Sequence, residues 1–316
     1  MPKQSNQNLV LEFVRVTEQA AIAAAAWIGK GERKLADKAA TDAMREAFNS
    51  VEFKGLVISG EGKKDEAPQL YEGEELGTGD GPEIDLAIDP LECTDSVANG
   101  RPNATTVIAG GSRGSFAQMP DIYVNSIAVG PQAKGAIDID ASIADNVKAV
   151  AKASNKPVEE ISVVILDRER HESMIKEIRD VGARVYLISD GTIAGAVATA
   201  MKDSPIDILM GLCGGVETAQ SAIALKCLGG EIQGRLAPKD EKQKKIAQES
   251  GIADFDKKYT MDDLVLSDNV MFVASGVIDG PMLKGVAFDE KGPIVRSIVM
   301  HNASKTVRFI ESRQTG

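Results

Sequence analysis

The sequence has few cysteines and no long apolar run, and each shortage excludes a class of protein. Three cysteines among 316 residues do not make a disulfide framework, and they fit a reducing cytosol. The longest apolar run near the start, residues 20–28, is too short to span a bilayer, and residues 1–8 lack the apolar core of a signal peptide. We therefore expect a cytoplasmic protein with no membrane partner.

Positive charge is also in short supply. The chain has 36 Lys and Arg residues against 47 Asp and Glu residues, and its formal net charge is −11. A nucleic acid or an anionic membrane would require a basic face, so we expect neither as a partner. A phosphorylated small molecule stays compatible with this balance, because bound divalent cations and a few local arginines can reverse the local field.

The most informative stretch is residues 84–94, which read Ile-Asp-Leu-Ala-Ile-Asp-Pro-Leu-Glu-Cys-Thr. Its first five residues alternate between apolar and polar or small side chains, the period of a strand with one buried face. Because Pro90 cannot donate to a ladder and disfavours helix in the residue before it, we expect the strand to end at Asp89. Glu92 and Thr94 then fall in the following turn.

This turn predicts a metal site. Two carboxylates so close together repel each other unless a cation lies between them. Oxygen ligands alone suit a hard ion such as Mg²⁺ or Mn²⁺. The other interpretation is an Asp-Pro turn with a solvated glutamate, and the stretch by itself leaves both open.

The two halves of the chain have different patterns, and we place a boundary near Pro157, with domains at 1–160 and 161–316. The first half mixes helices with strands and tends toward α+β. Its expected helices are 9–28, 35–48 and 143–153, and its expected strands are 56–59, 84–89, 105–109, 115–119 and 121–129. The second half alternates strands 162–166, 184–189 and 206–210 with helices 172–181, 193–201 and 217–228, before closing strands 270–275, 293–300 and 305–310. The fold class is therefore α/β, with a mixed sheet in the first domain and a largely parallel sheet in the second.

Ligands of such parallel sheets bind beyond the carboxyl ends of the strands. Arg168 and Arg170 follow the first strand of the second half, the pair Asp190-Gly191 follows the second, and residues 211–217 follow the third. We expect these three groups to gather along one edge of the sheet.

Each candidate also has an ordinary structural interpretation. Asp37 in the first turn of its helix and Glu217 at the start of another can stabilise helix termini through the dipole. Glu61, which follows a short strand between two glycines, reads as a loop carboxylate, and Tyr123 reads as a core residue with its hydroxyl at the rim.

The two histidines have different interpretations. His301 has no metal-binding neighbour in the sequence, so we interpret it as structural. His171 is interpreted as a neighbour that orients Arg170.

The stretch around Asp89, with Gly60-Glu61-Gly62 upstream, resembles the signature of the lithium-sensitive, metal-dependent sugar phosphatases. The closer resemblance is to the class II fructose-1,6-bisphosphatases of bacteria, and it runs nearly end to end. The matching segments are 15–18, 27–31, 42–45, 60–62, 65–68, 120–123, 129–131, 165–171, 189–191 and 267–270. The resemblance implies a layered α/β/α/β/α sugar-phosphatase fold and a homo-oligomer, either a dimer or a tetramer.

The resemblance also assigns roles to residues. It implies metal binding, to Mg²⁺ or Mn²⁺, by Asp37, Glu61, Asp89, Glu92 and Glu217. It implies that Asp37 and Thr94 form the catalytic pair that activates water. It implies substrate contacts at Glu92, Cys93, Thr94, Tyr123, Arg168, Glu169, Arg170, Asp190, Gly191, Thr192 and Gly214.

Several positions depart from the family pattern, among them Val216 and Thr218, which flank Glu217 where the family has Pro-Glu-Gly. Cys93 stands where most members have a glycine that lets phosphate approach the backbone closely. Lys63 replaces an acid of a Glu-x-Glu motif, and Thr192 replaces the last acid of an Asp-Gly-Asp motif.

The expected function is metal-dependent hydrolysis of the 1-phosphate of fructose 1,6-bisphosphate, which yields fructose 6-phosphate and phosphate in gluconeogenesis. The alternatives are a related substrate, sedoheptulose 1,7-bisphosphate or an inositol phosphate, and a paralogue that binds sugar phosphates without turnover. Cys93 and Lys63 motivate the last alternative, while the retained set of acids argues against it.

Overall fold

The computed structural model describes residues 6–60 and 69–315. The chain forms two units, residues 1–115 together with 267–316, and residues 116–266. This division differs from the expected boundary at residues 160 and 161. The reason is a long-range pairing, because strand β10 (Val270–Ile278) lies antiparallel to β4 (Ala104–Ser112) and so returns the C-terminal strands to the first unit.

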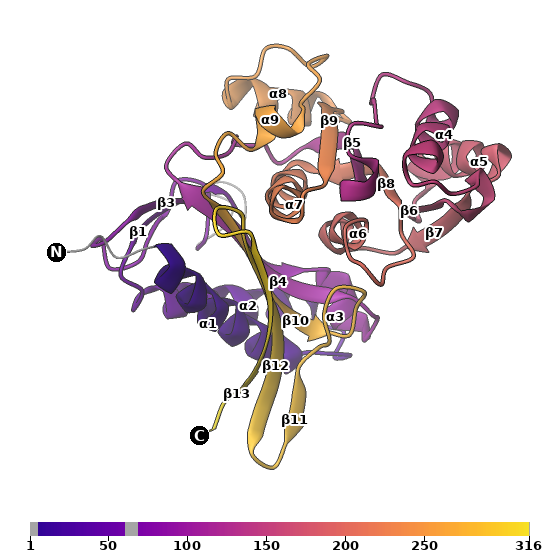
Figure 1. Cartoon of the computed structure of the whole chain (residues 1–316). Helices are drawn as coiled ribbons and strands as arrows, with labels where there is room; N and C mark the ends of the chain where they lie inside the picture. The colour runs from indigo at the N-terminus through magenta and orange to yellow at the C-terminus, as the bar shows by residue number, and fades with distance from the viewer. Residues whose placement is uncertain (1–5, 61–68, 316) are drawn as a thin grey trace. The chain divides into compact units, whose positions relative to one another are not determined.

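The first unit consists of helices and one mixed sheet (Figure 1). Besides β4 and β10, its elements are α1 (Asn6–Ala25), α2 (Arg33–Phe48), β1 (Lys54–Ser59), β2 (Glu75–Leu76), β3 (Glu83–Glu92), α3 (Thr94–Asn99), β11 (Ala287–Asp289), β12 (Gly292–His301) and β13 (Thr306–Arg313). In the described part of the chain the sheet has eight strands in the order β11-β12-β10-β4-β3-β1-β2, with β13 on the free side of β12. Among the described strands of this sheet, only the pair β1 and β3 is parallel.

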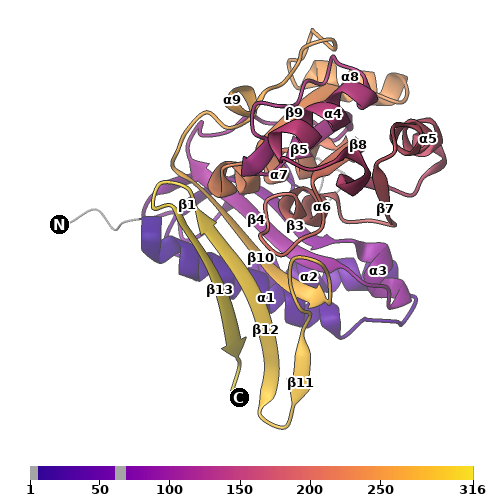
Figure 2. The same cartoon turned by 45° about the vertical axis from the view of Figure 1, so that its right-hand side comes forward.

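Helices α1 and α2 pack against each other and cover one face of this sheet, as Figures 1 and 2 show. The sequence of α1 is rich in alanine and free of Gly and Pro, which favours a continuous helix. Phe13 and Phe48 are fully buried between the two helices, with ring centroids 5.9 Å apart in an edge-to-face arrangement. In the described ranges, neither α1 nor any other helix combines the length and the apolar character that crossing a membrane requires.

Strand β3 does not end at Asp89, as expected, but continues to Glu92. The ladder with β4 pairs Asp89 with Val107 and then Glu92 with Thr105, so the register shifts across Pro90. Such an irregularity leaves the proline without a ladder partner and lets the strand pass it. Glu92 is therefore a strand residue, and only Cys93 separates the strand from α3.

Helix α2 begins at Arg33, two residues earlier than the sequence pattern suggested. Asp37 consequently lies in the second turn of the helix, and the first turn contains no acid. The interpretation of Asp37 as a helix-terminus stabiliser is therefore wrong, because the N-terminal backbone N–H groups lie one turn away.

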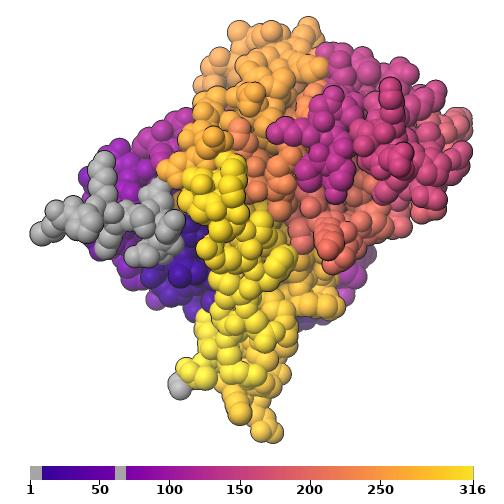
Figure 3. Space-filling model, viewed as in Figure 1, coloured from indigo at the N-terminus to yellow at the C-terminus, as the bar shows by residue number. Residues whose placement is uncertain are grey.

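The C-terminal strands form an antiparallel ribbon at one end of the first sheet (Figure 2). In the space-filling view these residues, yellow at the end of the chain, lie open on the surface (Figure 3). Phe288 on β11 and Phe309 on β13 are 61% and 60% exposed. Polar and charged neighbours on β13, including Arg308 and Glu311, protect this edge strand against pairing with other chains.

The second unit has a smaller mixed sheet with helices around it (Figure 1). Its elements are β5 (Tyr123–Val129), η1 (Pro131–Ala133), α4 (Ile143–Ala153), η2 (Val158–Glu160), β6 (Ser162–Leu166), η3 (Glu169–His171), α5 (Glu172–Val181), β7 (Arg184–Ile188), α6 (Thr192–Ala198), β8 (Ile208–Gly214), α7 (Gly215–Leu228), β9 (Glu231–Leu236), α8 (Glu241–Glu249) and α9 (Met261–Leu264).

The expected alternation of strands and helices in the second half is present, and the α/β class is confirmed. Strands β7, β6 and β8 are parallel neighbours, and β5 is inserted antiparallel between β8 and β9. The expectation of a largely parallel second sheet is therefore wrong, because the two pairings of β5 make the sheet mixed. The expected strand at 115–119 is wrong. Phe116 makes a single isolated bridge to Val265, because this segment finds no neighbouring strand. Its apolar residues reflect burial rather than a ladder.

Candidate active site

Two acids of the first unit, Asp89 and Glu92, lie at the end of β3. Asp89 is half-buried, and its Oδ1 accepts a hydrogen bond from the Leu91 N–H at 3.0 Å, which holds the carboxylate beside the proline bulge. Glu92 is 5% exposed. Asp85, earlier in the same strand, differs because it forms an ion pair of 2.6 Å with Arg113. The strand therefore carries one acid that is paired with an arginine, and two further acids beside the turn whose oxygens are of the type that binds hard cations.

The turn after β3 places a cysteine in an unusual conformation. Cys93 has φ 70° and ψ 47° and precedes the first residue of α3. A non-glycine residue in this left-handed region costs roughly 1 kcal/mol, which explains why glycine suits the position. The next residue, Thr94, lies with its Oγ1 3.4 Å from Nε of Arg33, and the same Nε is 3.4 Å from Oδ1 of Asp95.

Asp37 faces a partly buried environment on α2. Burial raises the pKa of its carboxyl above the ordinary value, and the positive charge of Arg33 opposes this rise. The proposed metal ligand Glu61 and the departure Lys63 lie outside the described residues.

The second unit brings its predicted residues to the carboxyl edge of the sheet, as the topology indicated. Arg168 directly follows β6, and its guanidinium donates to the backbone oxygens of Ser189 at 2.6 Å and Asp167 at 3.1 Å. These bonds join the turn after β6 to the turn after β7. Glu169 and Arg170 follow in η3 and are exposed.

Tyr123 and Gly214 are paired residues of β5 and β8 at the same edge. The guanidinium carbon of Arg170 lies 4.8 Å from the centroid of the Tyr123 ring, which is a cation–π contact. The structure therefore brings together residues from the turn after β6, the start of β5 and the end of β8.

The carboxylate of Glu217 lies in the first turn of α7, just beyond Gly214. Its pKa is raised to about 7, first by burial and then by the negative charges of Asp121 and Asp190, although a backbone N–H of the helix start opposes the rise. Gly191, in the left-handed region at φ 91°, lets the chain turn into α6, whose first residue Thr192 is buried. The environment of Glu217 therefore has two components. One is the N-terminus of α7, which the carboxylate can cap, and the other is the pair of acids Asp121 and Asp190.

His171 connects two strands of the second sheet that have separated. The ladder between β6 and β8 ends at Val164 and Leu209. The fully buried imidazole fills the gap further along, where Leu212 N–H donates to Nε2 at 2.9 Å and Nδ1 lies 2.9 Å from the Leu166 oxygen. Since Nε2 is an acceptor, the ring is neutral and Nδ1 carries the proton.

The environment of His171 agrees with this neutral state. Burial lowers its pKa, and the charges of Arg170 and Arg168 lower it further, although the bond to the Leu166 oxygen opposes the change. The expected role of His171 as a neighbour that orients Arg170 is consistent with this position at the base of the η3 turn.

His301 has a structural environment. It is 6% exposed, its Nδ1 lies 2.8 Å from the Ser304 hydroxyl, and its Nε2 lies 3.4 Å from the Asn269 side-chain oxygen. These contacts tie the turn after β12 to the start of β10.

The expected metal ligands do not form one compact cluster in the described structure. Within the residues that the structure describes, no group of three or more His, Cys, Asp or Glu residues is close enough to hold a metal ion. The proposed ligands are divided between the units, with Asp37, Asp89 and Glu92 in the first and Glu217 in the second. Their chemistry fits a hard cation, because all of the donors are carboxylates.

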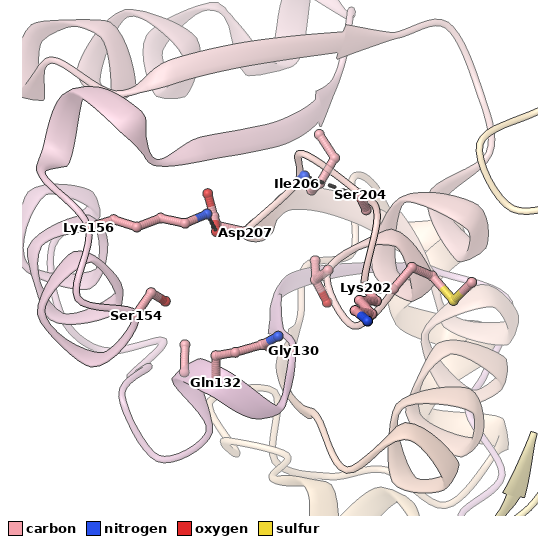
Figure 4. A pocket seen from close by; sticks show the side chains of 11 residues that line it. Gly130, Gln132, Ser154, Lys156, Lys202, Ser204, Ile206 and Asp207 are labelled. Carbon is pink, nitrogen blue, oxygen red and sulfur yellow. Dashed lines mark hydrogen bonds and ion pairs between the residues drawn. The ribbon is translucent and has the colours of Figure 1, made fainter.

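A cavity of about 140 Å³ lies at the opposite, amino edge of the second sheet (Figure 4). Lys156 points to Asp207 there, with Nζ 2.6 Å from Oδ1. Helices α4 and α6 both end at this cavity, at Ser154 and Thr199. Basic side chains complement the carbonyl ends of helices, so the lysines here have a structural role. None of the predicted site residues lines this cavity.

Sequence reasoning missed three charged residues around these groups. Arg33 precedes Asp37 by one helical turn and is visible as an i, i+4 neighbour once the start of α2 is known. Asp121 stands within a matching segment, but its effect on Glu217 needs the fold. Lys239 carries no sequence signal, and its Nζ lies 5.7 Å from the Tyr123 ring centroid.

Comparisons with known proteins cover almost the whole chain. A family model described as bacterial fructose-1,6-bisphosphatase, glpX-encoded, matches residues 7–314. A D-fructose 1,6-bisphosphatase class 2/sedoheptulose 1,7-bisphosphatase from a Synechococcus species is 39% identical, over 97% of this chain and 95% of that protein. Fructose-1,6-bisphosphatase 1 class 2 from Escherichia coli K12 is also 39% identical, with the same coverage of both chains. Among solved structures, an extragenic suppressor from Pyrococcus furiosus aligns at 14% identity and a TM-score of 0.34, over 64% of this chain and 74% of that chain.

Proposed function

Since this chain belongs to the class II, glpX-type bacterial fructose-1,6-bisphosphatases, we propose that it hydrolyses the 1-phosphate of fructose 1,6-bisphosphate to fructose 6-phosphate and phosphate. Membership makes it a phosphoric monoester hydrolase of carbohydrate metabolism. One observation of the structure supports this reaction above others. The carboxyl edge of the second sheet places the basic Arg170 on Tyr123 and the acidic Glu217 one turn beyond the paired Gly214.

The family is metal-dependent, and we propose Mg²⁺ or Mn²⁺ for this member. Asp37, Glu61, Asp89, Glu92 and Glu217 would hold it. A bound divalent cation lowers the pKa of water and neutralises charge on the phosphoryl oxygens. The absence of His and Cys from this donor set favours the two hard ions over zinc.

The remaining chemistry belongs to the protein. Thr94 relays a proton from the attacking water toward Asp37, whose raised pKa makes it a better proton acceptor than an ordinary aspartate. Arg33, beside the Thr94 hydroxyl, holds the positive charge that keeps the pKa of Asp37 from rising further.

The proposed substrate contacts are divided between two groups of residues. The turn of Glu92, Cys93 and Thr94 receives the phosphate that is cleaved. Contacts to the rest of the sugar phosphate come from Tyr123, Arg168, Glu169, Arg170, Asp190, Gly191, Thr192 and Gly214.

Sedoheptulose 1,7-bisphosphate is the second candidate substrate. The Synechococcus relative carries that activity in its name, and the two sugars share the same arrangement at the phosphate that is cleaved. We further propose that the protein acts in the cytoplasm as a homo-oligomer, a dimer or a tetramer, in gluconeogenesis.

Phosphate release tests this proposal. Chelated wild-type protein should be inactive on fructose 1,6-bisphosphate and should regain activity when Mg²⁺ or Mn²⁺ is added. Asp89→Ala should lower kcat by at least about 100-fold, because losing even an indirect partner of a metal ligand costs up to about that much. Glu83→Ala is the control, since Glu83 is an exposed acid at the start of the same strand.

The outcomes separate the alternatives. Activity on an inositol phosphate alone would replace the substrate. A wild-type protein that binds fructose 6-phosphate but releases no phosphate with either metal would indicate the non-catalytic paralogue.

A further inference from the structure

Two cations from distant parts of the chain contact the ring of Tyr123. The guanidinium carbon of Arg170 lies 4.8 Å from the ring centroid, and Nζ of Lys239 lies 5.7 Å from it. Arg170 belongs to the turn after β6, whereas Lys239 belongs to the connection between β9 and α8. Each distance is within reach of a cation–π attraction.

The backbone around Lys239 is attached to the start of β5. The side-chain oxygen of Gln243, on α8, accepts hydrogen bonds from the N–H of Lys239 at 3.0 Å and from the N–H of Tyr123 at 3.4 Å. The N–H of Ala237 donates to the oxygen of Tyr123 at 2.8 Å. The position of Lys239 beside the tyrosine is therefore set by the backbone and does not depend on its flexible side chain alone.

Neither cation has an acidic partner in the part of the chain that the structure describes. Among the described residues, no carboxylate oxygen lies within 4.0 Å of the charged nitrogens of Arg170 or Lys239. A comparison within the same unit shows what a structural contact of this kind looks like. Lys257 lies 4.7 Å from the Tyr259 ring centroid and also forms an ion pair of 3.1 Å with Asp263.

Two positive charges at one ring repel each other, and the chain has an excess of acids, with a net charge of −11, from which a partner could have been drawn. An anion placed between them removes the repulsion and gains charge-assisted hydrogen bonds from both. A phosphate monoester group, with two negative charges and three terminal oxygens, suits a guanidinium and an ammonium together.

We propose that Lys239 is a specificity-determining residue, which together with Arg170 binds the phosphate of the sugar bisphosphate that is not hydrolysed. This inference rests on the proposed phosphatase function. The phosphate that is cleaved must lie against the metal-binding acids. The second phosphate has to be held and then released intact, which a pair of cations without acidic partners can do. Lys239 thereby favours bisphosphates over monophosphates that lack this group.

The test compares substrates with and without the second phosphate. Lys239→Ala should raise KM for fructose 1,6-bisphosphate about 10-fold, as expected for one lost charge-assisted bond, with kcat changed less than about 2-fold. Its kcat/KM for fructose 1-phosphate, which has only the cleavable group, should stay within about 2-fold of the wild-type value. Lys239→Arg should restore most of the affinity for the bisphosphate, because it retains the charge.

Lys257→Ala is the matched control, because Lys257 is the lysine over a tyrosine that already has an acidic partner. It should leave KM for both substrates unchanged. An unchanged KM in Lys239→Ala, or an equal loss with fructose 1-phosphate, would overturn the assignment of Lys239.

Binding of fructose 6-phosphate, measured by calorimetry, separates this inference from the proposed function. The ligand carries only the phosphate that is retained, and its binding requires no turnover. Lys239→Ala should bind it about 10-fold more weakly than the wild type. Equal affinities, or a wild type that does not bind it, would contradict the role of Lys239, whereas weaker binding in a protein without turnover would contradict the phosphatase function alone.

Discussion

The two edges of the second sheet carry similar charges and use them differently. At the amino edge, Asp207 is satisfied on both oxygens, by Lys156 at 2.6 Å and by the N–H of Ser162 at 3.0 Å. At the carboxyl edge, Arg170 and Lys239 meet at one tyrosine without an acidic partner in the described part of the chain. Opposite charges that pair with each other stabilise the fold. Neighbouring charges of the same sign remain available to bind a ligand of the opposite charge.

The acids of the carboxyl edge agree with this difference. Glu217 is held where burial and the charges of Asp121 and Asp190 raise its pKa to about 7. The two edges of the sheet therefore differ. The amino edge carries an ion pair that stabilises the fold, and the carboxyl edge keeps charges of the same sign near one another, which is electrostatically unfavourable.

The largest expected effect is the difference in activity between two variants, one that lacks a cation at the carboxyl edge and one that lacks a cation at the amino edge. Arg170→Ala should lower kcat/KM for fructose 1,6-bisphosphate by about 100-fold, because a guanidinium can make two charge-assisted bonds to phosphate. Lys156→Ala should change it by less than about 2-fold, since Lys156 has a structural partner. Steady-state kinetics of the two variants checks the difference, and equal losses would show that the edges do not differ in function.

A smaller effect is expected from His171, the residue that links the separated strands. His171→Ala leaves the Leu166 oxygen and the Leu212 N–H without their partner, so it should lower the free energy of unfolding by about 2 kcal/mol. It should also raise KM by about 10-fold through misplacement of Arg170. His171→Gln, which can donate and accept, should restore part of both.

A double variant tests whether His171 acts through Arg170. If it does, His171→Ala should have little further effect on KM in the Arg170→Ala background, as measured in a double-mutant cycle. Additive effects would assign His171 to stability alone.

At the amino edge the expected effect is on stability only. Asp207→Ala should lower the free energy of unfolding by about 1–2 kcal/mol, because the buried Ser162 N–H loses its acceptor. Asp207→Asn keeps an acceptor and should cost about half as much. Urea denaturation measures both changes in stability. A change in KM for either variant would show that the amino edge also affects substrate binding and would contradict the difference between the edges.

The smallest effect concerns pH. Burial lowers the pKa of both His171 and His301 in the folded protein, so the unfolded chain binds protons first as the pH falls below about 6.5. Stability should therefore decline as the pH falls from 7.5 to 5.5 and level off below the folded pKa values. Replacing either histidine by glutamine should reduce this decline in urea denaturation, and an unchanged decline would show that the histidine titrates normally.

Much of the carboxyl edge could be predicted before the fold was known. Alternating strands and helices imply right-handed crossovers, so the residues after β6, β7 and β8 had to meet at one edge. This local and topological information also predicted Glu217 in the first turn of α7. Tyr123 was placed near the site by resemblance, and the structure explains its position through the antiparallel pairing with Gly214.

Other features could not be read from local patterns. From the sequence, Pro90 predicted that the strand would end at Asp89. A shift in the register with β4 lets β3 continue to Glu92. The start of α2 at Arg33 moved Asp37 out of the first turn. In the case of β3, pairing with a neighbouring strand overrode the local preference of the proline.

The sequence by itself determined the α/β class, the family and the residue types of the candidate site. Periodicity and motifs are local features, and they can be recognised without knowing which residues are in contact. Only the tertiary structure decided which residues share a unit, since the strands after residue 267 pair with β4 far back in the chain. It alone also decided that Lys239 joins Arg170 at Tyr123. A contact between residues so distant in the chain depends on packing, and no spacing in the sequence encodes it.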